Sequence, residues 1–133
     1  MHAIDTNVLI YAFDAHDKEK HKKASRILNE VFTGNAQAVV TNQILAEFVS
    51  AATTKLNPPL TTEEITRFLR SVQSSENWEI VNYDVSCVIL AAEMQKHFWD
   101  SLIAATLIGQ EVVLLTENQK HFSHTKLKTK NPF

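Results

Sequence analysis

The run Val112-Val113-Leu114-Leu115 decides the fold, because four consecutive apolar residues bounded by polar ones predict a strand that is buried on both faces. Working outward from this run, further short apolar segments also predict strands. They lie at residues 2–5, 37–41 and 79–83, with a weaker edge strand at residues 126–129. A strand buried on both faces requires cover on each side of its sheet.

The segments between these strands carry apolar residues at helical spacing. Helices are predicted at residues 7–13, 18–32, 61–72, 85–96 and 101–108, and Thr41 is placed to cap another whose apolar stripe reaches Ala52. Strands that alternate with helices imply right-handed crossovers and a parallel sheet. The predicted fold class is α/β with three layers, a central, mostly parallel sheet flanked by helices, in a single domain of residues 1–133.

Composition narrows the classes of function. Hydrophobic residues make up 44% and charged residues 21%, as in ordinary globular proteins. The net charge of −2 argues against nucleic-acid binding through a broad basic face. Lysines nevertheless cluster at residues 18–23 and 120–130, and each cluster is either a solvated face or the rim of a phosphate-binding site. Two glycines are too few for a glycine-rich phosphate loop. One cysteine and no apolar run of about 20 residues predict a cytoplasmic protein without a membrane segment.

Four acidic residues stand inside apolar sequence, where an ionised carboxylate is costly unless it is paired or bound to a metal. They are Asp5, Glu47, Glu93 and Asp100. Taken singly, each has an ordinary structural explanation. Asp5 and Asp100 could cap helices, because an anion is favoured at a helix amino terminus. Glu47 could be half-exposed, and Glu93 could lie at the edge of a helix face.

In combination, these acids predict a site. Asp5, Asp100 and the turn after Thr116 belong to elements that meet at the carboxyl ends of parallel strands, where such folds bind ligands. Carboxylates crowded there repel one another unless a cation intervenes. The absence of cysteine or histidine at zinc spacing favours Mg²⁺ or Mn²⁺. The nearest histidine pair, His121 and His124, is expected to be exposed.

Four stretches, in order along the chain, resemble the PIN domain and, within it, the VapC toxins of bacterial and archaeal toxin–antitoxin pairs. The stretches are Asp5-Thr6-Asn7-Val8-Leu9-Ile10, Glu47 before Phe48-Val49, Trp99-Asp100-Ser101-Leu102-Ile103-Ala104-Ala105, and Leu114-Leu115-Thr116-Glu117-Asn118. The resemblance covers essentially the whole chain.

This resemblance implies an acidic pocket that binds Mg²⁺ or Mn²⁺ and hydrolyses RNA. Asp5, Glu47 and Asp100 match the acidic metal-site positions, and they are the expected catalytic residues. Four polar residues are expected to support these acids or contact the RNA: Thr6, Asn7, Thr116 and Asn118. As a VapC-like toxin, the protein would form a homodimer and would be silenced by a cognate antitoxin protein.

Two departures from the family pattern bear on activity. Many relatives carry an aspartate where this chain has Asn118, and the segment before Trp99 looks shortened. A PIN-fold module that binds RNA or a partner with weakened catalysis therefore stays open as an alternative. A receiver-like signalling domain fits less well, because Asp5 is followed by Thr6-Asn7 rather than by a second acid.

Overall fold

The computed structural model describes residues 1–133 as a five-stranded sheet with helices on both faces. Along the chain the elements are β1 (His2–Ile4), α1 (Thr6–Tyr11), α2 (Lys18–Phe32), β2 (Ala38–Thr41), α3 (Asn42–Thr54), α4 (Thr62–Ser74), β3 (Trp78–Val81), α5 (Val85–Met94), α6 (Phe98–Leu107), β4 (Val113–Leu115), the 3₁₀ helix η1 (Gln119–Phe122) and β5 (Lys128–Lys130).

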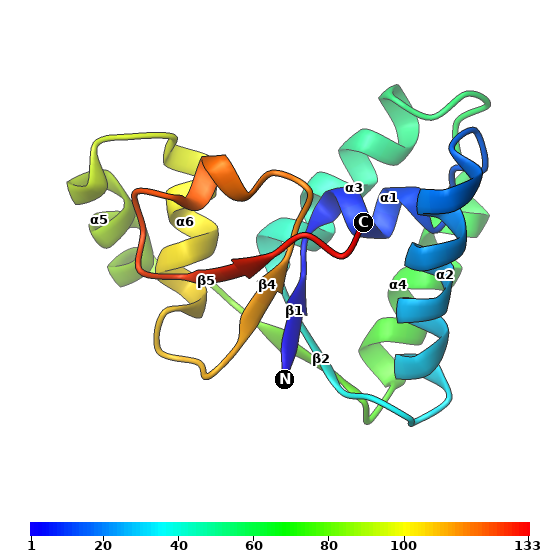
Figure 1. The fold of residues 1–133 in the computed structure, drawn as a ribbon, viewed down its shortest axis with the longest axis horizontal. Helices are drawn as coiled ribbons and strands as arrows, with labels where there is room; N and C mark the ends of the chain where they lie inside the picture. Colours follow the sequence, from blue (N-terminus) through cyan, green and yellow to red (C-terminus); the bar gives the residue numbers. More distant parts are fainter.

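The sheet has the strand order β3-β2-β1-β4-β5, and every pair in it is parallel. Helices α1 to α4 cover one side, and α5 and α6 cover the other (Figure 1). The predicted three-layer α/β fold is therefore confirmed. No helix combines the length and the apolar character that crossing a membrane requires.

The strand order fixes where a ligand can bind. From β1, the chain reaches β2 through helices on one face of the sheet, and it later reaches β4, on the other side of β1, through helices on the opposite face (Figure 1). The connections therefore diverge beyond the carboxyl ends of β1 and β4, leaving a crevice there. Asp5 follows β1, and Thr116 follows β4, so both residues lie at this crevice.

A buried aromatic cluster holds α3 against the helices around it. Phe48 of α3 is fully buried, and its ring centroid lies 5.0 Å from that of Phe68 and 5.5 Å from that of Phe13. Truncating such a ring to alanine typically costs about 3–5 kcal/mol. Because Phe48 fixes the rotation of α3 in the core, the preceding residue, Glu47, is held on the crevice side.

The cap predicted at Thr41 is confirmed, and helices α4 and α5 of the structure also have side-chain caps. Thr41 accepts a hydrogen bond from Ile44 N at 3.0 Å, Thr61 and Glu64 form a reciprocal capping box, and Asp84 caps α5. These caps satisfy N–H groups that the first turn of a helix leaves without partners.

Several predicted boundaries differ from the structure. Strand β3 begins one residue earlier and ends two residues earlier than residues 79–83, and β5 lies at Lys128–Lys130 rather than at residues 126–129. Helix α5 ends at Met94 because Gln95 adopts a left-handed conformation, with φ 56°. Helix α6 begins at Phe98, three residues before the predicted start.

The early start of α6 changes the role of Asp100. The N-cap of α6 is His97, which has a left-handed backbone conformation with φ 45° and makes no side-chain capping hydrogen bond. Asp100 lies inside the first turn, so its carboxylate is not used as a cap. The helix amino terminus still favours an anion at that place.

Candidate functional site

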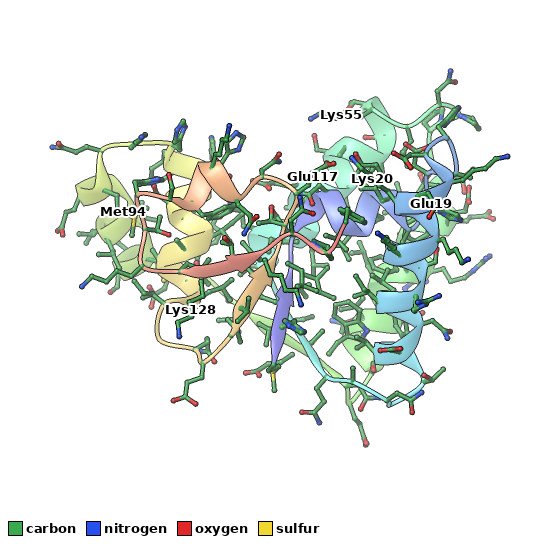
Figure 2. All side chains as sticks on the ribbon, in the orientation of Figure 1. Glu19, Lys20, Lys55, Met94, Glu117 and Lys128 are labelled. Carbon is green, nitrogen blue, oxygen red and sulfur yellow. The ribbon has the colours of Figure 1, made fainter.

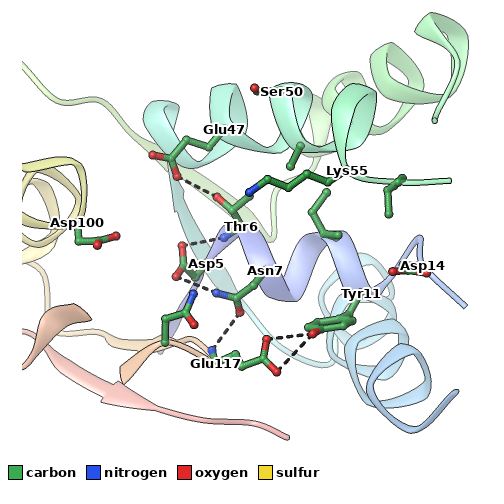
Figure 3. Close-up of a pocket in the computed structure, with 14 residues that line it drawn as sticks. Asp5, Thr6, Asn7, Tyr11, Asp14, Glu47, Ser50, Lys55, Asp100 and Glu117 are labelled. Atoms are coloured by element: carbon green, nitrogen blue, oxygen red, sulfur yellow. Dashed lines mark hydrogen bonds between the residues drawn. The ribbon is translucent and has the colours of Figure 1, made fainter. Parts of the chain in front are cut away.

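Asp5 is the centre of the site, and it serves two purposes. It is the N-cap of α1, where Oδ1 accepts a hydrogen bond from Thr6 N at 2.8 Å. Its Oδ2 accepts one from Thr116 Oγ1 at 2.7 Å. The same oxygen accepts another from Asn7 Nδ2 at 3.2 Å (Figure 3). The side chain is 6% exposed, so its orientation is fixed by these three donors.

Asn7 and Thr116 join the ends of β1 and β4 into one network. Asn7 Nδ2 donates to Thr116 Oγ1 at 3.2 Å, and Asn7 Oδ1 accepts from Glu117 N at 3.0 Å. Thr116 Oγ1 also accepts from Asn118 N at 3.0 Å. The sequence-predicted polar residues thus surround Asp5, and they hold its carboxylate in place without neutralising it.

Glu47 reaches the site from α3. Its Oε2 accepts a hydrogen bond from Thr6 Oγ1 at 3.3 Å, and its Oε1 accepts one from Gln43 Nε2 at 2.8 Å. Gln43 is buried one turn earlier on the same helix, and its amide also donates to Trp99 O at 2.8 Å. Gln43 therefore connects Glu47 to the start of α6, which carries Asp100.

Asp100 approaches from α6, across the cavity from Asp5 and Glu47 (Figure 3). Partial burial raises the pKa of Asp100, and the neighbouring histidines oppose this increase. His121 Nδ1 lies 3.5 Å from Asp100 Oδ2, and His124 Nε2 lies 2.8 Å from Ser101 Oγ. The expectation that these two histidines are simply exposed was wrong for His124, which is partly buried.

Six of the seven sequence-predicted residues line one open cavity of about 460 Å³, and Thr116 lies directly behind it. Burial raises the pKa of Asp5 to about 6, and the charges of Glu47 and Asp100 add to the increase, while the hydrogen bonds from Thr116 and Thr6 oppose it. No lysine or arginine pairs with Asp5 or Glu47. The negative charges of Asp5 and Glu47 are therefore not neutralised by an ion pair within the protein.

Two further carboxylates line the cavity, Asp14 and Glu117. Glu117 faces away from Asp5, and its carboxylate accepts a hydrogen bond from Tyr11 Oη at 3.0 Å (Figure 3). The same carboxylate forms an ion pair with Lys20. Asn118 lines the same wall, at the position where the family resemblance leads us to expect an aspartate. Because Lys20 already neutralises Glu117, this carboxylate does not replace the missing one.

The chemistry of the donor set fits a hard divalent cation, since only carboxylate, amide and hydroxyl oxygens meet in the cavity. No three carboxylate or histidine side chains converge closely enough to hold a metal ion as they stand. Mg²⁺ commonly retains several waters and takes only one or two carboxylates directly. The set therefore fits an ion bound partly through water.

The lysines near the end of the chain do not surround this cavity. Lys126 and Lys128 line a different hollow, together with Met1, at the amino-terminal ends of the strands. Figure 2 shows Lys128 apart from Lys20, Lys55 and Glu117, which gather at the other end of the sheet. The basic residue that does line the acidic cavity is Lys55.

Sequence reasoning missed Gln43, Glu117 and His121 as neighbours of the acids. Gln43 precedes Glu47 by four residues, a helical spacing that places both on one face and could have been recognised. Glu117 and His121 carry no such signal. They reach the site through the turn after β4 and through η1, whose paths depend on tertiary packing.

A model of the PIN domain family matches residues 3–127 of the chain. No curated protein matches it in sequence.

Several solved structures share the fold. FitAcB from Neisseria gonorrhoeae superposes with a TM-score of 0.68 at 16% identity, covering 99% of this chain and 98% of that one. VapBC2 from Rickettsia felis, bound to a DNA fragment of its promoter, gives 0.64 at 20% identity, covering 98% and 97%. A toxin–antitoxin complex from Klebsiella pneumoniae gives 0.64 at 18% identity, covering 100% and 98%.

Proposed function

The chain belongs to the PIN domain family, and we propose that it is a Mg²⁺- or Mn²⁺-dependent endoribonuclease, the toxin of a toxin–antitoxin pair. Members of this family are generally nucleases that depend on a divalent metal. One observation carries the proposal: Asp5, Glu47 and Asp100 line a single cavity at the crevice of the sheet, with no cationic side chain paired to Asp5 or Glu47. Uncompensated carboxylates in such a place are best explained by a bound cation.

Each residue has a proposed task. Asp5 and Asp100 bind the ion, directly or through water, and Glu47 either binds it or accepts a proton from the attacking water. Asn7 and Thr116 hold Asp5, and Thr6 holds Glu47, so these contacts fix the acids before substrate arrives. Asn118 donates from its amide to a phosphate oxygen of the substrate. When bound, the ion supplies a more acidic water and neutralises charge on the scissile phosphate.

The test is cleavage of purified RNA by the purified protein. We expect cleavage with Mg²⁺ or Mn²⁺ and none with excess EDTA. Glu47→Gln and Asp100→Asn should each lower the rate by at least about 100-fold, with circular dichroism spectra unchanged. Cleavage that persists in EDTA would contradict the metal dependence. RNA binding without cleavage would instead support the weakened, binding-only module.

The proposed antitoxin is a protein that presents a basic segment to the acidic cavity. The Klebsiella structure is itself a toxin–antitoxin complex of similar fold, which supports this class of partner. RNA as the substrate makes the cytoplasm the proposed compartment. Expression of the unmodified chain alone should slow growth, Asp5→Asn should relieve the effect, and harmless expression of active protein would argue for a housekeeping nuclease.

The proposed homodimer uses an apolar face of α5 and the start of α6. Val85 is 73% exposed, Ile89 is 55% exposed and Trp99 is 62% exposed, an unusual concentration of large apolar side chains in solvent. Burying this face against a second copy would remove it from water. Ile89→Glu should therefore shift the protein from dimer to monomer in analytical ultracentrifugation, and an unmodified protein that is monomeric would rule the dimer out.

A further inference from the structure

Lys55 is the one lysine or arginine that lines the acidic cavity, among five carboxylates. It follows α3 as the C-cap residue, and its backbone N–H donates to Ala51 O at 2.8 Å, which fixes the start of its side chain. The side chain points into the cavity, toward the end that holds Thr6 and Glu47 (Figure 3). Lys55 is exposed, so its ammonium group is accessible from solvent as well as lying beside the cavity.

The ammonium group of Lys55 has no partner in the protein. No carboxylate oxygen lies within 4.0 Å of it, and it donates no hydrogen bond. Lys20 provides the contrast, because it is tied to Glu117 and Tyr11 at the rim of the same cavity. Lys55 is therefore a free cation held beside a site whose proposed substrate is a polyanion.

Two further hollows adjoin the cavity, and each shares lining residues with it. It shares Glu47 and Ser50 with a neighbouring hollow of about 560 Å³, and it shares Asp14 and Leu56 with another of about 430 Å³. Leu56, which directly follows Lys55, lines both the acidic cavity and the second hollow, whereas Lys55 lines the acidic cavity alone. A chain longer than one nucleotide could pass over the acids and reach Lys55.

We propose that Lys55 binds a phosphate of the RNA strand next to the scissile phosphate. The inference rests on the proposed ribonuclease function. A polyanion that enters a cavity of five carboxylates is repelled, and a bound metal offsets this only at the reacting phosphate. Lys55 supplies the attraction at the neighbouring phosphate, and as a contact to the backbone it carries no base preference.

The test compares Lys55→Met with Lys22→Met, since both remove one positive charge and keep an unbranched side chain. Lys22 on α2 is exposed and lines none of these hollows. The probe is a short single-stranded oligoribonucleotide that the unmodified protein cuts at one mapped position. Lys55→Met should raise KM about tenfold with kcat little changed, as expected for one charge-assisted contact. Lys22→Met should leave both constants unchanged, and Lys55→Arg should restore most of the affinity.

A second measurement locates the contact. Methylphosphonate, which removes the charge of a single phosphate, is placed in turn at each position beside the cut. At one position, the methylphosphonate should lower kcat/KM of the unmodified protein about tenfold. The same substitution should change kcat/KM of Lys55→Met very little, because this variant already lacks the contact. The slope of log KM against log salt should fall by about 0.7 in Lys55→Met.

The outcomes separate the two proposals. If the unmodified protein cuts RNA and Lys55→Met behaves as Lys22→Met does, the assignment of Lys55 is wrong and the ribonuclease proposal stands. Equal losses from methylphosphonate in both proteins at every position would also overturn it. If the unmodified protein cuts no RNA with either metal, both proposals fail.

Discussion

Asp5→Asn should make the metal-free protein more stable at neutral pH and less stable in acid. The side chain is almost fully buried, and burial raises its pKa from 3.8 to about 6. The folded state therefore holds the proton more tightly than the unfolded chain does. As the pH rises from about 4 to 6, the unfolded chain releases the proton first, and the free energy of unfolding of the native protein falls.

The size of the effect follows from the pKa. A difference of about 2 pH units corresponds to about 3 kcal/mol of destabilisation once the pH exceeds 6. Asparagine never ionises, so the variant escapes this loss. Its amide oxygen can still cap Thr6 N, but its NH₂ group would face the Asn7 Nδ2 donor, which costs about 1 kcal/mol. The net gain is about 2 kcal/mol above pH 7, and the net loss is about 1 kcal/mol near pH 4.

Thermal unfolding of both proteins in EDTA, at several pH values, measures where the stability difference between them changes sign. For a chain of this length, the variant should melt roughly 5–10 °C higher at pH 7.5 and a few degrees lower at pH 4. Adding Mg²⁺ should then raise the midpoint of the unmodified protein more than that of the variant, because only the former has the ligand. A shift of equal size at both pH values would refute the reasoning, and a lower midpoint at pH 7.5 would show that capping outweighs repulsion.

Three further variants test the surroundings of the acids. Asn118→Asp should tighten Mn²⁺ binding in calorimetry and lower the metal-free melting point through like-charge repulsion; no change in either would mean that Asn118 does not face the ion. Gln43→Leu removes a buried donor to Glu47, so it should cost about 1–3 kcal/mol in urea unfolding and slow cleavage, whereas undiminished stability would contradict the bridge between α3 and α6. Thr116→Val removes the hydrogen bond that lowers the pKa of Asp5, so Mn²⁺ binding should require a higher pH than in the unmodified protein; an unshifted pH profile would show that the hydroxyl does not govern Asp5.

The sequence predicts the sheet and its acidic edge because both follow from local patterns. Apolar runs specify buried strands, and in a parallel sheet the residue after each strand reaches the same edge. The positions of Asp5 and Thr116 follow from this rule alone. The placement of Glu47 and Asp100 needs the family resemblance as well, since helix position alone does not say which face meets the crevice.

The remaining neighbours depend on backbone geometry without a clear sequence signature. Gln95 and His97 both adopt left-handed conformations, which are uncommon for residues other than glycine, asparagine and aspartate. They end α5 and start α6 earlier than the apolar spacing predicts, and this moves Asp100 from a capping position into the first turn. The path that brings His121 beside Asp100 follows from the same packing.

The hydrogen bond from Thr116 to Asp5 joins residues separated by 111 positions, and this separation governs when the site can exist during synthesis. Translation at about 5–20 residues per second places roughly 6–22 s between the two residues. Until β4 has been made, β1 lacks one of its two neighbours in the sheet, and the cavity lacks the turn that holds Asp5. A ribosome-bound nascent chain therefore carries Asp5 without a complete cavity until β4 and the turn after it have been synthesised.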